Sequence, residues 1–183
     1  PNTLAAQAHG WIPIDVPGYP GGIHSGPPDP PLSYTSFAHA YVGTIDGVRT
    51  AAITFRGTDP ENDGISEFIT QVARWDEYYA FHQLFVQSAL TWAAGAGIDQ
   101  VVVTGHSLGG IIAEEFAAND RDFNALARDA YVVTFGSPGS PEKAQPNRLL
   151  QFIHTGDPVA QLDNLILNRE GTTIEIQRPE IVG

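Results

Sequence analysis

Apolar and polar positions alternate along the middle of the chain in a way that predicts strands followed by helices. Residues 101–104 are a run of β-branched residues bounded by turn formers, which predicts a short buried strand. Apolar side chains then recur at helical spacing between residues 108 and 116. Residues 78–94 predict another helix, because their aromatic and apolar side chains fall on one face and glycines follow.

Further strands are predicted on both sides of this central part. Residues 36–55 predict two strands joined at Asp46-Gly47, a dipeptide typical of hairpin turns. Residues 130–135 and 149–153 predict two more strands, and residues 172–178 alternate like an edge strand. Strands that alternate with helices predict an α/β fold, with a mainly parallel central sheet flanked by helices.

The first 36 residues have a different composition. Residues 17–31 hold six prolines and four glycines, which excludes a helix or central strand and favours a surface loop. Residues 1–16 carry a weak apolar pattern that favours a flap or a short strand. Because only 16 residues precede the proline-rich stretch, we interpret residues 1–36 as an N-terminal extension rather than a separate domain.

Composition limits the class of protein further. The length of 183 residues predicts one domain, 1–183, with a substantial core. The net charge of −12 argues against nucleic acid and against electrostatic docking on anionic lipid. Cysteine is absent, which excludes disulfides and a thiol nucleophile. Since the sequence starts at Pro1 without a methionine, we expect that it was processed or excised from a longer polypeptide.

The strongest candidate for chemistry is the sequence Gly-His-Ser-Leu-Gly at 105–109. A strand, then G-x-S-x-G, then a helix is the context of a nucleophile-bearing turn. Gly105 and Gly109 provide the space that such a tight turn needs. Backbone N–H groups at the start of the helix would face negative charge that forms beside Ser107. The simpler alternative, a glycine-rich connection, does not account for the serine.

Three predicted strands end in residues capable of chemistry. Ligands of open α/β sheets gather at the carboxyl ends of strands, where Ser107, Asp157 and Thr58 each follow a strand. A serine nucleophile needs a base, an acid that orients the base, and donors for the oxyanion. Asp157 comes after the serine, as the acid of such hydrolases does. The alternative for Asp157, which precedes a proline, is a residue that only starts a turn.

An acidic cluster at residues 59–64 suggests a calcium loop. The pattern fails, because Glu61 occupies the third position and Thr70 the twelfth, where a glutamate is required. We therefore predict no metal site.

Four motifs in a fixed order resemble the class-three lipase family. They are FRGTD at 55–59, VTGHSLGG at 103–110, TFGSPG at 134–139 and FIHTGDPV at 152–159. The likeness covers roughly residues 37–163 and implies an α/β-hydrolase-like fold. The family includes fungal-type triacylglycerol lipases, related esterases and phospholipases, so the motifs do not specify the substrate.

The resemblance implies a role for each matching residue. Ser107 would be the nucleophile and Asp157 the triad acid, with no cofactor required. The backbone N–H of Leu108 would be one oxyanion donor, and Thr58 would supply another through its backbone N–H and hydroxyl. Residues 60–75 would correspond to a lid that is apolar enough to meet a lipid interface or to cap a hydrophobic cleft. The alternative for this segment is an ordinary amphipathic surface helix.

The resemblance also implies a triad histidine some tens of residues after Asp157, and the sequence has no histidine there. His106 is not the base in the family, and relatives often carry a structural histidine at the position of His154. For His82 we expect a packed or solvent-facing role. Nothing in the sequence shows that any of the remaining histidines reaches Ser107. The six histidines are His9, His24, His39, His82, His106 and His154.

Two explanations of the missing histidine lead to different functions. If the domain is truncated at its C-terminus, the protein is a serine hydrolase that cleaves carboxylic esters of the acylglycerol type. If the base is lost, turnover falls by about 10⁴- to 10⁶-fold, and an acyl-binding domain remains. A phospholipase or a short-acyl esterase is a further alternative. We expect a neutral lipid or other ester as substrate, no nucleic-acid partner, and a secreted protein.

Overall fold

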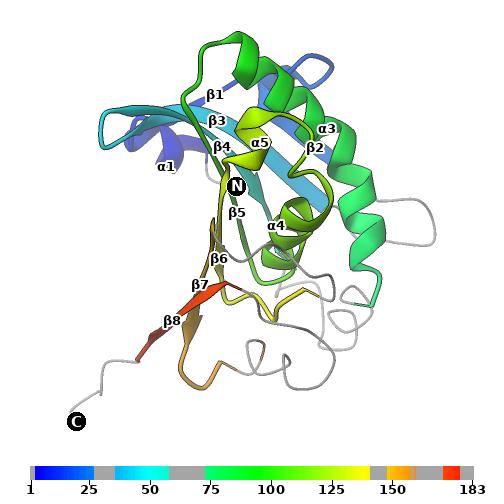
Figure 1. The fold of residues 1–183 in the computed structure, drawn as a ribbon, viewed down its shortest axis with the longest axis vertical. Coiled ribbons are helices and arrows are strands. Elements are labelled where there is room, and N and C mark those ends of the chain that lie inside the picture. The colour runs from blue at the N-terminus through cyan, green and yellow to red at the C-terminus, as the bar shows by residue number, and fades with distance from the viewer. Residues whose placement is uncertain are drawn as a thin grey trace.

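The structure is a computed structural model of the 183-residue chain (Figure 1). It describes residues 3–26, 36–57, 73–140, 148–157, 159 and 171–177. The strands are β1 (Ile12–Pro13), β2 (Ile23–Gly26), β3 (Ser36–Ile45), β4 (Val48–Phe55), β5 (Gln100–His106), β6 (Tyr131–Phe135), β7 (Leu149–His154) and β8 (Thr172–Ile176). The helices are α1 (Thr3–Ala8), the 3₁₀ turn η1 (Pro20–Gly22), α3 (Trp75–Gly95), α4 (Leu108–Asn119) and α5 (Ala125–Arg128).

Within the described residues, eight strands form one mixed sheet. Its order is β1-β3-β4-β5-β6-β7-β8, and β2 also pairs with β3. Strands β4 to β8 run parallel, whereas β1, β2 and β4 each pair antiparallel with β3. Asp46 and Gly47 have φ values of 50° and 81°, the left-handed conformation of a type I′ hairpin turn. The mainly parallel α/β fold and the hairpin are confirmed.

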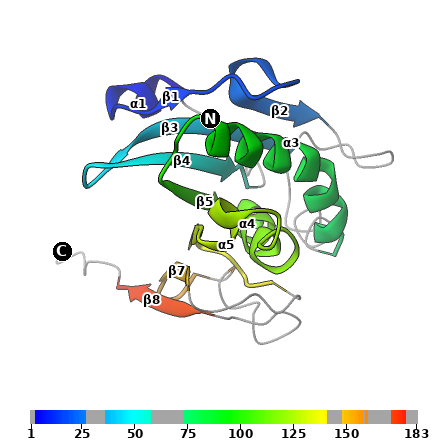
Figure 2. The ribbon, with the colours of Figure 1, turned by 45° about the horizontal axis from the view of Figure 1, so that its top comes forward.

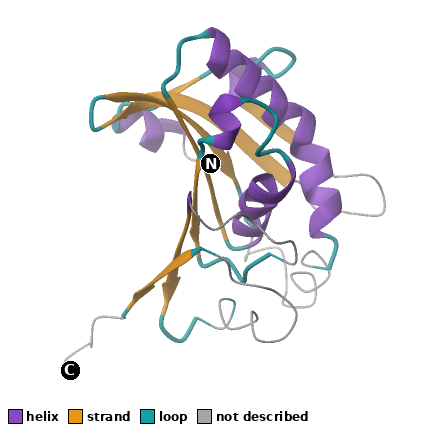
Figure 3. Cartoon of the chain, in the orientation of Figure 1, coloured by secondary structure: helices purple, strands orange, loops and turns teal. Residues whose placement is uncertain are grey.

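The strand order explains where the helices lie. Each strand from β5 to β8 lies beside the strand before it and runs in the same direction, so right-handed crossovers place their helices on one face. Helices α3, α4 and α5 lie along this face (Figure 2), and Figure 3 shows them as one layer beside the strands. The carboxyl ends of β4 to β8 therefore lie at the same edge of the sheet.

The core lies between this helical layer and the sheet. The apolar face of α3 supplies Phe85 and Leu90, and α4 supplies Ile111 and Ile112, all with no exposed surface. Val103, in the middle of β5, is equally buried opposite them. The predicted helix at 78–94 thus exists with its apolar face inward, three residues longer at its start and one longer at its end.

The N-terminal region is more ordered than its composition predicts. Residues 20–22 form a 3₁₀ turn and residues 23–26 form β2, which pairs with β3 from Ile23 opposite His39 to Gly26 opposite Ser36. The prediction of a surface loop over residues 17–31 is therefore wrong for this part. The proline-free residues 23–26 retain the backbone N–H groups that an edge strand needs. Most of the predicted lid, residues 60–75, lies outside the described residues.

Helices α3 and α4 are joined by a buried carboxylate. Asp120, the residue after α4, is 4% exposed and accepts hydrogen bonds from side chains of α3. The donors are the Tyr79 hydroxyl and the Nε2 groups of Gln83 and Gln87, the last at 2.9 Å. Burial raises the pKa of the Tyr79 hydroxyl, so this group stays protonated and donates.

We expect the variant Asp120→Ala to lower the free energy of unfolding by about 2–3 kcal/mol, because it leaves the buried Tyr79 hydroxyl and two half-buried amide groups without an acceptor. The negative charge at a helix C-terminus is itself unfavourable by less than about 1 kcal/mol, so its removal does not offset this loss. The urea midpoint measures the change. The exposed Asp122→Ala is the matched control and should leave the midpoint within error. An unchanged midpoint for Asp120→Ala would show that the three donors find water instead.

Candidate active site

Ser107 occupies the turn between β5 and α4 and has a strained backbone. Its φ of 55° and ψ of −125° put a non-glycine residue in a left-handed conformation. The backbone N–H of Ser107 donates to the Phe135 carbonyl at 2.9 Å, and its own carbonyl accepts from Gly110 at 2.8 Å. The hydroxyl does not cap the helix, although serine is a preferred capping residue. The turn therefore fixes the backbone of Ser107 and leaves its hydroxyl uncommitted to α4.

Glycines let three backbone segments meet at this turn. A Cβ on Gly105 would lie 2.0 Å from the Gly109 carbonyl oxygen, and one on Gly109 would lie 2.4 Å from the Phe55 carbonyl oxygen. A Cβ on Gly57 would lie 2.4 Å from the His106 carbonyl oxygen and 3.1 Å from the Ser107 Cβ. The end of β4 thus packs directly against the serine, as the predicted grouping of strand ends requires.

The start of α4 offers donors for an oxyanion. Leu108 is the first residue of α4, and the first N–H groups of a helix have no carbonyl partner within it. They also carry the positive end of the helix dipole. Thr58, the other predicted donor, lies outside the described residues, directly after Gly57. Its role stays a prediction.

Asp157 lies beyond the end of β7, where its carboxylate faces the turn at Gly136. Its Oδ1 accepts the Val159 N–H at 2.9 Å, so Asp157 does start a turn. Its Oδ2 lies 3.3 Å from the position that a Cβ on Gly136 would occupy, and the His106 Nε2 lies 3.6 Å from the same position. One carboxylate oxygen thus serves the turn, while the other points towards the end of β6 beside the serine turn.

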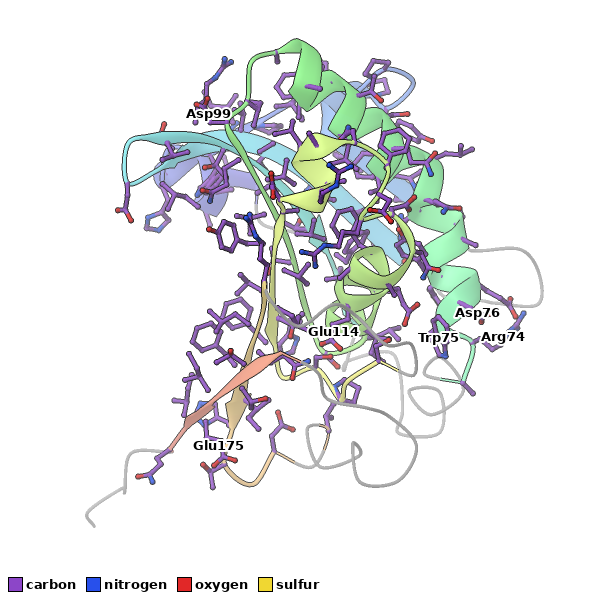
Figure 4. All side chains as sticks on the ribbon, viewed as in Figure 1. Arg74, Trp75, Asp76, Asp99, Glu114 and Glu175 are labelled. Carbon is purple, nitrogen blue, oxygen red and sulfur yellow. The ribbon has the colours of Figure 1, made fainter. Side chains whose placement is uncertain are left out.

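Two buried glutamates on α4 were not predicted as part of this region. Glu114 and Glu115 are 1% and 0% exposed, and Glu114 lies where α4 meets the sheet (Figure 4). Thr134 of β6 donates to Glu114 at 3.2 Å, and the Ser140 hydroxyl donates to Glu115. Both bonds attach the helix that begins at the serine turn to β6 and the segment after it. The one signal in the sequence was that Glu115 falls at an apolar position of the helical pattern.

All six histidines lie within the described residues, and none of them forms a hydrogen bond to Ser107 or Asp157 there. His82 is packed in the interior and bonds to His24 and Ser36, as expected for a structural histidine. His39 bonds through Nδ1 to the Tyr41 hydroxyl at 2.7 Å. The other three side chains are exposed: His9, His106 and His154. The structure therefore does not identify a base for the serine.

The described residues contain no group of three side chains suited to hold a metal ion, and the acidic cluster at 59–64 lies outside them. The helices in the described ranges lack the combination of length and apolar character that crossing a membrane requires.

A mainly parallel sheet with α3, α4 and α5 on one face and a serine at a strained strand-to-helix turn defines an α/β-hydrolase-like fold. The family model "Lipase (class 3)" matches residues 52–166. The chain belongs to the class 3 lipase family, as its four motifs predicted. No curated protein matches the sequence.

Solved structures with a similar fold are fungal lipases. A mutant form of MDLA from Penicillium cyclopium is 17% identical with a TM-score of 0.59, over 79% of this chain and 60% of that one. The lipase from Rhizopus microsporus var. chinensis is 18% identical with a TM-score of 0.54, over 90% of this chain and 64% of that one. Lipase II from Rhizopus niveus is 21% identical with a TM-score of 0.51, over 77% of this chain and 62% of that one. This chain thus spans less than two thirds of their length.

Proposed function

We propose that this chain carries the nucleophile and the acid of a serine hydrolase that cleaves carboxylic esters of the acylglycerol type. The observation that carries the proposal is the conformation of Ser107, strained at a φ of 55° with its hydroxyl uncommitted at the start of α4. The Asp157 carboxylate at the same edge of the sheet and membership of the class 3 lipase family support it.

In the proposed reaction, the Ser107 hydroxyl attacks the ester carbonyl and passes its proton to a histidine. The backbone N–H groups of Leu108 and Thr58 stabilise the oxyanion that forms. Collapse of the intermediate releases the alcohol, which takes the proton, and leaves the acyl group on the serine. Water then attacks the acyl-enzyme, gives its proton to the histidine, and releases the acid. The mechanism uses no cofactor.

Asp157 would orient the histidine through Oδ2, because Oδ1 already accepts the Val159 N–H. This division predicts the outcome of Asp157→Asn, since the amide oxygen can still accept from Val159 while the charge that holds the histidine is lost. We expect kcat to fall by about 10⁴-fold with KM little changed. The thermal midpoint controls for the turn and should stay near that of the wild type. If the thermal midpoint instead falls markedly, the loss of activity reflects a disrupted turn, and Asp157 is assigned to the turn alone.

Labelling with a fluorophosphonate tests the proposal directly. The full-length protein should acquire one adduct, and peptide mapping by mass spectrometry should place it on Ser107. A folded full-length protein that takes up no label would overturn the mechanism. Activity against esters of increasing acyl length, compared with a phospholipid, then separates an acylglycerol lipase from a short-acyl esterase or a phospholipase. We propose that residues 60–75 contact a lipid interface. We also propose an extracellular location, on the basis of the acidic, cysteine-free composition.

A non-catalytic acyl-binding domain is the second candidate function. The observation that favours it is that no histidine of the described residues bonds to Ser107 or Asp157. Such a domain would bind a non-hydrolysable ester analogue with ordinary affinity, yet neither hydrolyse the ester nor react with the phosphonate. Binding measured by calorimetry beside the labelling experiment distinguishes the two functions.

A further inference from the structure

Strand β2 meets helix α3 through a pair of histidines. The Nδ1 atoms of His24 and His82 lie 3.0 Å apart, and the Ser36 hydroxyl lies 2.7 Å from the His82 Nε2. His24 belongs to β2, His82 to the buried face of α3, and Ser36 begins β3. Three elements far apart in the sequence thus meet at one imidazole, which has no exposed surface.

The hydrogen bond between the two rings depends on their protonation. A neutral imidazole has one N–H donor and one acceptor nitrogen, so one Nδ1 donates and the other accepts. When both rings are charged, two N–H groups face each other at 3.0 Å and the bond cannot form. Even a single charge is unfavourable at this place, because the imidazolium would lose its hydration.

The surroundings of the pair offer little compensation for a positive charge. The His24 ring stacks on Phe81 with centroids 4.3 Å apart and meets Tyr19 edge-on at 5.0 Å. The His82 ring lies 5.5 Å from Phe55. Among the aromatic rings of the described residues that contact the pair, the one further titratable side chain is Tyr19, which precedes β2. No carboxylate of the described residues bonds to either histidine.

We propose that the His24–His82 pair is an acid-sensitive latch, which holds β2 against α3 while both rings are neutral and releases it as the rings take up protons. The latch does not depend on the ester chemistry. Its opening would uncover the Phe81 ring, since His24 stacks on it and a Cβ on Gly26 would lie 3.2 Å from its Cζ.

The direction of the pH dependence follows from the shifts at both histidines. Burial lowers the pKa of His82 to about 3, with a smaller contribution from His24, and burial also lowers the pKa of His24. A group whose pKa is lower in the closed state stabilises that state. This stabilisation is fully present at pH values above the ordinary pKa of about 6.5. The stabilisation is lost progressively as the pH falls from about 6.5 towards 3. At pH 5 one such histidine shifts the opening equilibrium by about 30-fold.

Amide hydrogen exchange at pH 7 and pH 5, corrected for the intrinsic rates, tests the latch. In the wild type, the protection of the β2 amides, residues 23–26, should fall by about 30-fold or more at pH 5. The amides of β5, residues 100–106, serve as the internal reference and should stay more strongly protected than those of β2 at both pH values, because the latch opens without unfolding β5. Equal protection of β2 at both pH values would overturn the proposal. So would equal protection of β2 and β5 at each pH, which would mean that β2 opens only when the whole fold unfolds.

A double variant shows whether the two histidines cause the effect. His24→Phe combined with His82→Leu replaces the pair with apolar side chains, and β2 should then keep equal protection at pH 5 and pH 7. His154→Gln, at an exposed position of β7, is the control and should retain the fall of about 30-fold. A double variant that still loses β2 protection at pH 5 would refute the latch. If this variant does not fold, the exchange of the wild type at pH 7 and pH 5 is sufficient to test the latch.

Discussion

Replacing Ser107 with alanine should lower the kcat for ester hydrolysis by the full-length protein by about 10⁴- to 10⁶-fold. The variant removes the proposed nucleophile and leaves the proposed oxyanion donors of α4 in place. Substrate binding should therefore change little. Because the Ser107 hydroxyl does not cap α4, its removal should not destabilise the fold.

Hydrolysis of a chromogenic ester, with the thermal midpoint recorded in parallel, measures both effects. Ser88→Ala, a half-buried serine on α3, is the matched control and should keep full activity. If Ser107→Ala retains hydrolysis, another group of the protein is the nucleophile and the proposed mechanism is wrong. If the wild type binds a non-hydrolysable ester analogue but does not hydrolyse the ester, the acyl-binding function takes precedence.

The elements that the sequence predicts well are those determined by local physics. The helix that became α3 shows its apolar face within a single stretch of chain, and Asp46-Gly47 carries the conformational preference of a hairpin turn in two residues. The placement of Ser107 also follows locally, since the strand, the glycines and the helix adjoin one another. Its grouping with Asp157 at one edge needed only the rule that parallel strands end on the same side.

What escaped prediction depends on contacts between distant segments. The prolines around β2 led to the prediction of a surface loop, whereas residues 23–26 form an edge strand because β3 is available as a partner. Glu114 and Glu115 look like solvated helix residues, and their burial depends on Thr134 and Ser140, some 20 and 25 residues further along the chain. Neither the sequence nor the structure identifies a base for the proposed nucleophile, because no histidine of the described residues bonds to Ser107 or Asp157.

The serine turn itself should be the part of the fold least tolerant of added bulk. We expect Gly105→Ala to lower the free energy of unfolding by at least about 3–4 kcal/mol. The new Cβ would lie 2.0 Å from the Gly109 carbonyl oxygen, 2.2 Å from its carbonyl carbon and 2.7 Å from the Gly110 nitrogen. All three are backbone atoms, so no side chain can rotate away. Strand β5 and helix α4 must separate instead, which also displaces Ser107.

Differential scanning fluorimetry should show a fall of about 10 °C in the thermal midpoint of Gly105→Ala. Gly95→Ala, at the last residue of α3, is the matched control, because a Cβ there would meet no atom within 4 Å. This variant should be neutral or slightly stabilising, since alanine favours a helix more than glycine does. A midpoint for Gly105→Ala close to that of the control would mean that β5 and α4 can move apart at little cost. The strained conformation of Ser107 would then not depend on the glycines around it.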